Sequence, residues 1–312
     1  MMEPGYEKVA FWELDLEAEG RPAPAPHSVQ PCIHTSGVVD IGIFQEPKDI
    51  RVPAQEVDRG PGGKYYSILK LFFRFGASEA WTTATGWLLK DDLVVTAAHC
   101  LYHDGQRATC IRACIGYNAS SEDAAGDQRL VTRVALPLEW IRDKTEARDI
   151  AFLQLNGPFQ NATPIAYGTP EVNALQEFAV IGYPADMGEE TVPGSKMYEM
   201  KIQRNVDLER TGWNMLVYQG DLYGGFSGAP VIRDSDAAAI GVHVRGGSFN
   251  SAVVIGGPYG VRIQAYEEVL KMLGKGGDGA ELGFETKTDV DETWLRYVNV
   301  PQLLHGSDGV KG

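Results

Sequence analysis

The stretch GDLYGGFSGAPVI, residues 220–232, places Ser227 in a glycine-rich segment directly before a short apolar run. Such a serine is either an ordinary turn residue or an exposed nucleophile. The serine elbow of α/β-hydrolases reads G-x-S-x-G and joins a strand to a helix. Here Ala229 stands at the last position of that pattern, and APVI is typical of a strand. The sequence therefore excludes that elbow and leaves the question of which fold presents the serine.

A serine hydroxyl is a weak nucleophile and needs a base that is oriented by a third group. The segment TGWLLKDDLVVTAAHC predicts two apolar strands joined by a turn, followed by small residues that leave His99 exposed at the edge of a barrel. In RDIAFLQL, Asp149 directly precedes an apolar strand, which predicts a buried carboxylate. We therefore expect a catalytic triad of His99, Asp149 and Ser227.

Short segments rich in β-branched and aromatic residues dominate the chain from about residue 64 onward. The 36 glycines and 17 prolines also favour an all-β architecture with many turns. We expect a double six-stranded β-barrel, with the first barrel over 46–165 and the second over 166–274. Apolar residues at helical spacing in VRIQAYEEVLKMLG predict a helix at the end of the second barrel. Residues 1–45 and 275–312 are expected to be irregular extensions.

The segments TAAHC, DIAFLQL and GGFSGAPV resemble the three active-site segments of chymotrypsin-like serine proteases, and they stand in the same order along the chain. The resemblance covers about residues 49–270, and the short form without the usual disulfides is similar to the glutamyl endopeptidase group. It implies a double barrel and a serine endopeptidase that works through an acyl-enzyme. It also implies an oxyanion hole formed by the backbone N–H groups of Gly225 and Ser227.

Two positions depart from the family pattern. Phe226 replaces the aspartate that pairs with a new N-terminus in trypsin-like enzymes, so the usual zymogen switch is absent. The usual partner of the cysteine after the catalytic histidine is also missing, because no cysteine lies near residue 84. The chain has four cysteines: Cys32, Cys100, Cys110 and Cys114. Their spacing fits no zinc motif well, and both free thiols and a bridge from Cys100 to Cys110 or Cys114 remain open.

The residues expected to set the substrate preference give competing signals. His243 falls where glutamyl endopeptidases place the histidine that binds a substrate carboxylate, and Arg245 would add positive charge. Asp221 falls where trypsin has the aspartate that selects Lys or Arg, and Leu222 replaces the Ser or Thr of the Glu-specific group. His243 could instead be a core histidine, and Asp221 a turn residue.

We expect cleavage after Glu or Asp, with trypsin-like cleavage after Lys or Arg directed by Asp221 as the alternative. Val244 and Gly246, on the strand of His243, are expected to line the same pocket. The alternative from another class is a catalytically silent protease homologue that binds peptides along the edge formed by residues 244–246.

The charge and composition of the chain argue against some classes of binding partner. The net charge of −14 argues against nucleic acid, whose binding depends on basic groups. No apolar run approaches the length of a membrane span, and no secretory signal opens the chain as given, so a cytoplasmic location is favoured. The expected partner is a polypeptide substrate, with no metal or organic cofactor. An N- or C-terminal extension that occupies the cleft and holds the enzyme latent is a further hypothesis.

Overall fold

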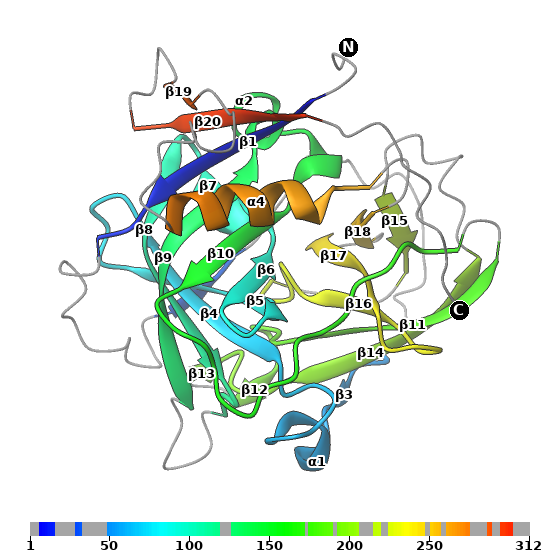
Figure 1. The fold of residues 1–312 in the computed structure, drawn as a ribbon. Helices are drawn as coiled ribbons and strands as arrows, with labels where there is room; N and C mark the ends of the chain where they lie inside the picture. The colour runs from blue at the N-terminus through cyan, green and yellow to red at the C-terminus, as the bar shows by residue number, and fades with distance from the viewer. Residues whose placement is uncertain are drawn as a thin grey trace.

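The structure is a computed structural model that describes twelve segments of the chain (Figure 1). They are residues 6–15, 29–32, 49–118, 126–171, 174–189, 192–205, 215–219, 224–246, 250–256, 260–274, 286–288 and 294–301. The described strands fall into two large antiparallel sheets and one short hairpin. Among the described residues, no helix combines the length and apolar character that a membrane crossing requires.

The first sheet contains a closed ring of six strands in the order β4, β8, β9, β10, β6 and β5. Its strands are β4 (Ile68–Phe75), β5 (Trp81–Lys90), β6 (Leu93–Thr96), β8 (Gln106–Ile115), β9 (Asp127–Pro137) and β10 (Ala151–Leu155). The ring closes because β8 pairs with both β4 and β9, for example Arg112 with Leu130. Large apolar side chains such as Trp87 and Phe152 are fully buried against this sheet.

The second sheet has the order β15, β18, β17, β16, β11, β14 and β3. Its strands are β3 (Val52–Pro53), β11 (Leu175–Gly182), β14 (Tyr198–Asn205), β15 (Met215–Tyr218), β16 (Pro230–Arg233), β17 (Ala239–Arg245) and β18 (Asn250–Val254). Among the described residues the two ends of this sheet do not pair, so it curls as a half-barrel. The expected chymotrypsin-like double barrel is confirmed, with the second barrel open. The boundary at 165/166 stays a prediction.

The terminal extensions differ from the expectation, because each contributes strands. The strand β1 (Tyr6–Glu13) lies between β9 and β20 (Arg296–Pro301), with β19 (Thr286–Thr288) beyond β20 (Figure 1). Phe11 and Trp12 of β1 are buried, as are Val298 and Val300 of β20. A second short strand, β2 (Val29–Pro31), runs parallel to β5. These apolar side chains show no long pattern of alternation. Their burial stabilises the extensions as additional strands of the first sheet.

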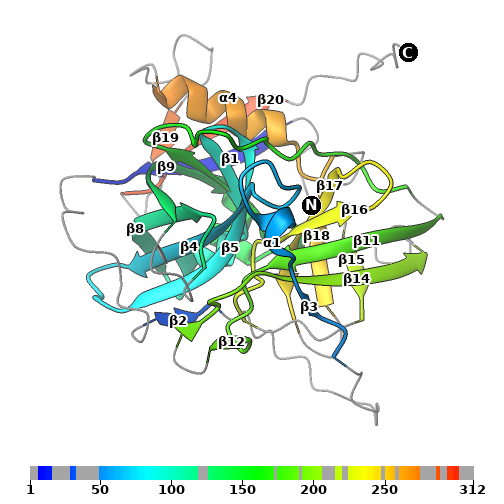
Figure 2. The same cartoon turned by 90° about the horizontal axis from the view of Figure 1, so that it is seen from below.

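The expected C-terminal helix is confirmed as α4 (Ile263–Gly274). It follows the second sheet in sequence but packs on β9, β10 and β1 of the first (Figure 2). Tyr266 stacks on Phe152 at 4.5 Å between ring centroids, and its hydroxyl donates to Glu7 of β1 at 2.6 Å. The remaining short elements are β7 (Tyr102–His103), β12 (Gly188–Glu189), β13 (Val192–Pro193), α1 (Glu56–Arg59), α2 (Leu138–Asp143), η3 (Ala98–Cys100) and η4 (Glu146–Arg148).

Candidate active site

The imidazole of His99 lies in the helical turn η3, directly after β6. The small side chains of Ala97 and Ala98 are fully buried and allow this tight turn. The sequence predicted an exposed imidazole, but His99 is fully buried. Trp140 of α2 lies close to its ring, with the centroids 6.4 Å apart. The prediction of exposure was wrong because it took no account of neighbours from other segments.

The structure brings His99, Asp149 and Ser227 into one chain of hydrogen bonds. Nδ1 of His99 lies 2.7 Å from Oδ2 of Asp149, and Nε2 lies 2.9 Å from the hydroxyl oxygen of Ser227. Oδ1 of Asp149 accepts a further bond from the backbone N–H of His99 at 2.8 Å. With both carboxylate oxygens engaged, Asp149 fixes the ring orientation and the tautomer that leaves Nε2 facing the serine.

The loop that carries Ser227 requires glycine on both sides. Gly225 has φ +100°, and a Cβ there would lie 2.4 Å from the carbonyl oxygen of Tyr183. Gly228 has φ +86°, and a Cβ there would collide with Thr96. Both positions therefore need glycine for conformation and for space.

The same loop is tied to the first barrel through β5. The hydroxyl of Thr85 donates to the Gly225 carbonyl at 2.7 Å, and the Thr85 N–H donates to the Ser227 carbonyl at 2.9 Å. Within the described part of the chain, the N–H groups of Gly225 and Ser227 donate no hydrogen bond. The oxyanion hole at these two N–H groups stays a prediction.

His243, on β17, lies beneath the serine loop, and its backbone exchanges hydrogen bonds with that loop. Its N–H donates to Ala229, and its carbonyl accepts from Gly228 at 2.7 Å. The side chain is buried, and Nδ1 lies 2.7 Å from the hydroxyl of Tyr218. Burial, aided by the charge of His99, lowers the pKa of His243 to about 3, so the ring is neutral.

The structure describes only some of the other residues predicted to line the pocket. Arg245 forms an ion pair with Glu146 of η4 at 3.6 Å, so its charge is partly compensated. Val244 is buried, and Gly246 is exposed at the end of β17. Asp221 and Leu222 lie outside the described residues. The role of Asp221 in selecting Lys or Arg therefore stays a prediction.

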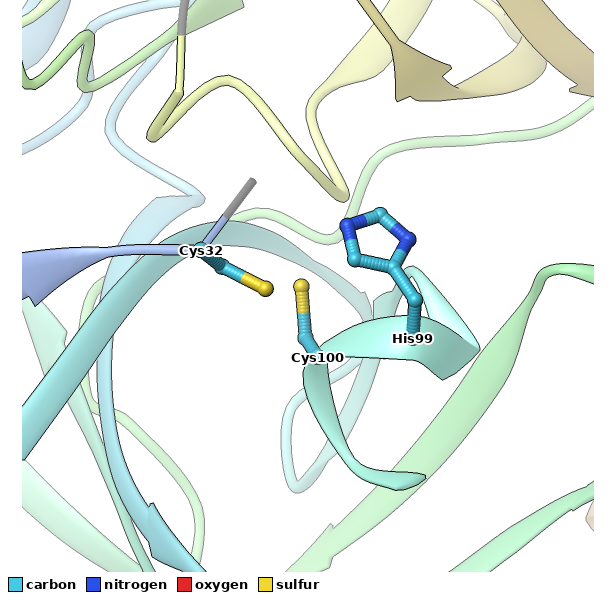
Figure 3. A group of neighbouring side chains, drawn as sticks. All are labelled: Cys32, His99 and Cys100. Carbon is cyan, nitrogen blue, oxygen red and sulfur yellow. The ribbon is translucent and has the colours of Figure 1, made fainter. Parts of the chain in front are cut away.

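A pair of thiols beside His99 was missed by the sequence reasoning. Cys32 follows β2, and its N–H donates to the carbonyl of Thr83 on β5 at 2.9 Å. Its sulfur, that of Cys100 and a ring nitrogen of His99 all lie within 4.8 Å of one another (Figure 3). Cys32 thus reaches the strand around residue 84 from a distant part of the chain. All four cysteines are free and buried.

The charges of this cluster are coupled. A hydrogen bond from Cys100 lowers the pKa of Cys32 to about 5, whereas burial holds the pKa of Cys100 well above its usual value. Burial also opposes a charged imidazole at His99, but Asp149 and then Cys32 outweigh it and raise the pKa of His99 to about 10. The two shifts run in opposite directions, and each favours the charged form of its own group beside the charged form of the other.

A double barrel with an Asp–His–Ser chain between its halves defines the chymotrypsin-like class of proteins. A family model for the trypsin-like peptidase domain matches residues 84–242, just over half of the chain, and includes all three of these residues. The chain belongs to this trypsin-like peptidase family.

Known proteins share the fold over a large part of the chain. An extracellular metalloprotease of Bacillus subtilis (strain 168) is 29% identical over 192 residues, which are 59% of this chain and 58% of that relative. The chain thus matches less than two thirds of that protein's length.

The solved structure of a Glu endopeptidase with MPD is 20% identical, with a TM-score of 0.58 over 72% of this chain and 98% of the other. The inactivated scabies mite protease paralogue S-I1 is 20% identical, with a TM-score of 0.52 over 70% of this chain and 97% of the other. The second of these shows that the fold alone does not decide activity.

Proposed function

We propose that the protein is a serine endopeptidase that hydrolyses peptide bonds through an acyl-enzyme. The observation that carries the proposal is the unbroken hydrogen-bond chain from Asp149 through His99 to Ser227. The two N–H groups beside the serine, which donate to no described group, add the second requirement of acyl transfer.

In this mechanism the Ser227 hydroxyl attacks the substrate carbonyl while Nε2 of His99 accepts its proton. Asp149 stabilises the resulting imidazolium, and the N–H groups of Gly225 and Ser227 bind the developing oxyanion. His99 then donates the proton to the leaving amine, and water repeats the sequence on the acyl-enzyme. The Asp149 carboxylate favours the imidazolium form that His99 takes after it accepts the serine proton.

Labelling with a fluorophosphonate probe tests the activity directly. We expect one label per chain, located on Ser227 by peptide mapping. The Ser227→Ala variant should take up no label. As a matched control, Ser195→Ala alters a buried serine of the same barrel that lies outside the triad, and it should still be labelled. A folded wild-type protein that stays unlabelled would show a silent peptide-binding homologue instead.

For the residue preference we propose cleavage after Glu or Asp, supported by the environment of His243. The buried Tyr218 hydroxyl lies 2.7 Å from Nδ1 of His243, and we assign the hydroxyl as the donor. Donation to Nδ1 leaves the proton of the neutral ring on Nε2. Nε2 can then donate a hydrogen bond to a substrate carboxylate, and no positive charge on the ring is needed.

The preference is tested with a peptide library and the Tyr218→Phe variant. We expect cleavage after Glu, with kcat/KM for a Glu substrate reduced about tenfold in the variant, the equivalent of one lost hydrogen bond. Tyr198→Phe removes a hydroxyl of the same barrel away from His243 and should change the rate little. A preference for Lys or Arg would assign the pocket to Asp221 instead.

We also propose that a terminal extension inhibits the enzyme intramolecularly, and that the segment containing β2 is the inhibitory part. It is supported by Cys32, which follows β2 and lies beside His99. Deleting both extensions would not test latency, because it would also remove β1 and β20, which are strands of the first sheet. Cleavage confined to residues 16–28 or 33–48, by an inserted protease site, is the sharper test. An unchanged rate after cleavage would argue against latency.

A further inference from the structure

The buried cluster of Cys32, Cys100 and His99 offers two thiols and an imidazole within one small space. The three potential ligand atoms lie within 4.8 Å of one another, and the three side chains come from two segments far apart in the sequence (Figure 3). Figure 3 shows the two sulfur atoms side by side, facing the edge of the imidazole ring. Proteolysis by a triad uses neither thiol, so the mechanism leaves them without a role.

We propose that Cys32, Cys100 and Nε2 of His99 form a binding site for a thiophilic divalent cation of the Zn²⁺ type. The inference that this cation inhibits the enzyme rests on the proposed peptidase function. The binding itself does not.

The ligand set fits such a cation chemically. Zn²⁺ binds thiolates at about 2.3 Å and imidazole nitrogen at about 2.0 to 2.1 Å. In tetrahedral geometry these lengths place the ligand atoms about 3.5 to 3.8 Å apart, so the observed cluster has to contract by about 1 Å at most. Two thiolates and a neutral imidazole balance the charge of the cation, and the Asp149 carboxylate lies on the other side of the ring.

Asp149 supplies the outer partner that metal-binding histidines require. A ligating histidine usually donates its second N–H to a carboxylate, which fixes the ring and raises its basicity. Here Nδ1 lies 2.7 Å from Asp149, so Nε2 is the nitrogen that can face a cation. The arrangement that orients His99 toward Ser227 is thus also the one that orients it toward a metal.

The cation binds two thiolates and a neutral imidazole, so binding displaces any protons that the two sulfur atoms and Nε2 carry. The cation then holds the lone pair of Nε2 that would accept the serine proton. Binding there would break the hydrogen bond between Nε2 and the hydroxyl of Ser227, which are 2.9 Å apart. The peptidase would be inactive until a chelator removed the cation.

The binding test uses the full chain with Ser227→Ala, reduced and free of metal, with Co²⁺ as a spectroscopic probe. Before titration, the denatured protein should show four free thiols, matching the four cysteines. We expect one equivalent of Co²⁺ to give a sulfur-to-cobalt charge-transfer band and the visible bands of a tetrahedral site. Cys32→Ser should weaken binding at least about tenfold, since even the outer partners of metal ligands are worth 10- to 100-fold.

The matched control is Cys110→Ser, which removes another buried thiol of the first barrel outside the cluster and should keep both bands. If Cys32→Ser does not fold, Cys100→Ser gives the same comparison. A band that persists without Cys32, or no band in protein whose four thiols are free, overturns the site.

The inhibition is measured separately on the active protein, as the fraction of fluorophosphonate labelling lost with Zn²⁺ and regained with a chelator. We expect the Zn²⁺ concentration for half-inhibition to rise at least about tenfold in Cys32→Ser. Because the Co²⁺ assay requires no activity, failure of the peptidase proposal leaves that assay intact. Binding of Co²⁺ without Zn²⁺ inhibition would overturn only the inhibitory role.

Discussion

The side chain of Lys70, on β4, is buried completely, and its ammonium group has no hydrogen-bond partner among the described residues. Its surroundings are the rings of Phe72, Tyr117 and Tyr183, at 5.5 to 6.0 Å from Nζ to the centroids. Burial lowers the pKa of Lys70 from 10.5 to about 7, although Cys114 acts slightly in the other direction. The folded protein therefore binds this proton more weakly than the unfolded chain does.

The cost of burying Lys70 in folding free energy follows from its pKa in the folded protein and in the unfolded chain. Above pH 10.5 Lys70 is neutral in both states and carries no penalty, and the penalty grows as the pH falls and is complete below about pH 7. At about 1.4 kcal/mol for each pH unit between the two values, the folded state loses about 5 kcal/mol. We therefore expect Lys70→Met, which nearly keeps the volume, to raise the free energy of unfolding at pH 7 by about 3 to 5 kcal/mol.

Urea unfolding at pH 7 and pH 10, in the Ser227→Ala background to prevent autolysis, measures this effect. The wild-type protein should gain about 1.4 kcal/mol per pH unit more than Lys70→Met over that interval. Lys64→Met, at a lysine whose side chain is 52% exposed, should stay within about 0.5 kcal/mol of wild type. A less stable Lys70→Met protein, or equal pH slopes, would refute the reasoning.

We predict three further mutational effects, two at the active site and one at the contact between β1 and α4. Asp149→Asn should lower kcat by about 10⁴ in a peptide assay, because the ring of the histidine is no longer held in the correct tautomer. Gly225→Ala should lower kcat at least about 10²-fold, because the new Cβ meets the Tyr183 carbonyl and displaces an oxyanion donor; an unchanged rate would show that the loop adapts. Glu7→Ala should reduce the free energy of unfolding by about 2 to 4 kcal/mol in urea, since a buried carboxylate that accepts from α4 is lost. Glu13→Ala, at an exposed carboxylate of the same strand, should have little effect.

The double barrel and the three triad positions could be predicted because local patterns carry them. His99 follows a hairpin of apolar strands, and Asp149 directly precedes a buried strand. Ser227 lies in a loop whose backbone requires the glycines Gly225 and Gly228. Each pattern lies within one short continuous segment, so a single sequence displays it directly.

The parts that could not be predicted depend on contacts between distant segments. Nothing around Cys32 indicates that it lies next to Cys100, because β2 reaches β5 through a short parallel pairing. The strands β1 and β20 could not be predicted either, because β1 pairs with β9 and β20, and β20 pairs with β1 and β19. The missing alternation in such edge segments reflects tertiary packing that overrides local preference.

The pairing of β1 with β20 has a consequence for the order of folding. Tyr6 pairs with Pro301, so these neighbours in the sheet come from opposite ends of the chain. During synthesis, β9 is available to β1 long before β20 emerges, and the entire second barrel is made in between. Until the last strand arrives, β1 is an open edge that can pair with another chain. The final steps of synthesis therefore both complete the sheet and remove its most exposed site for misassembly.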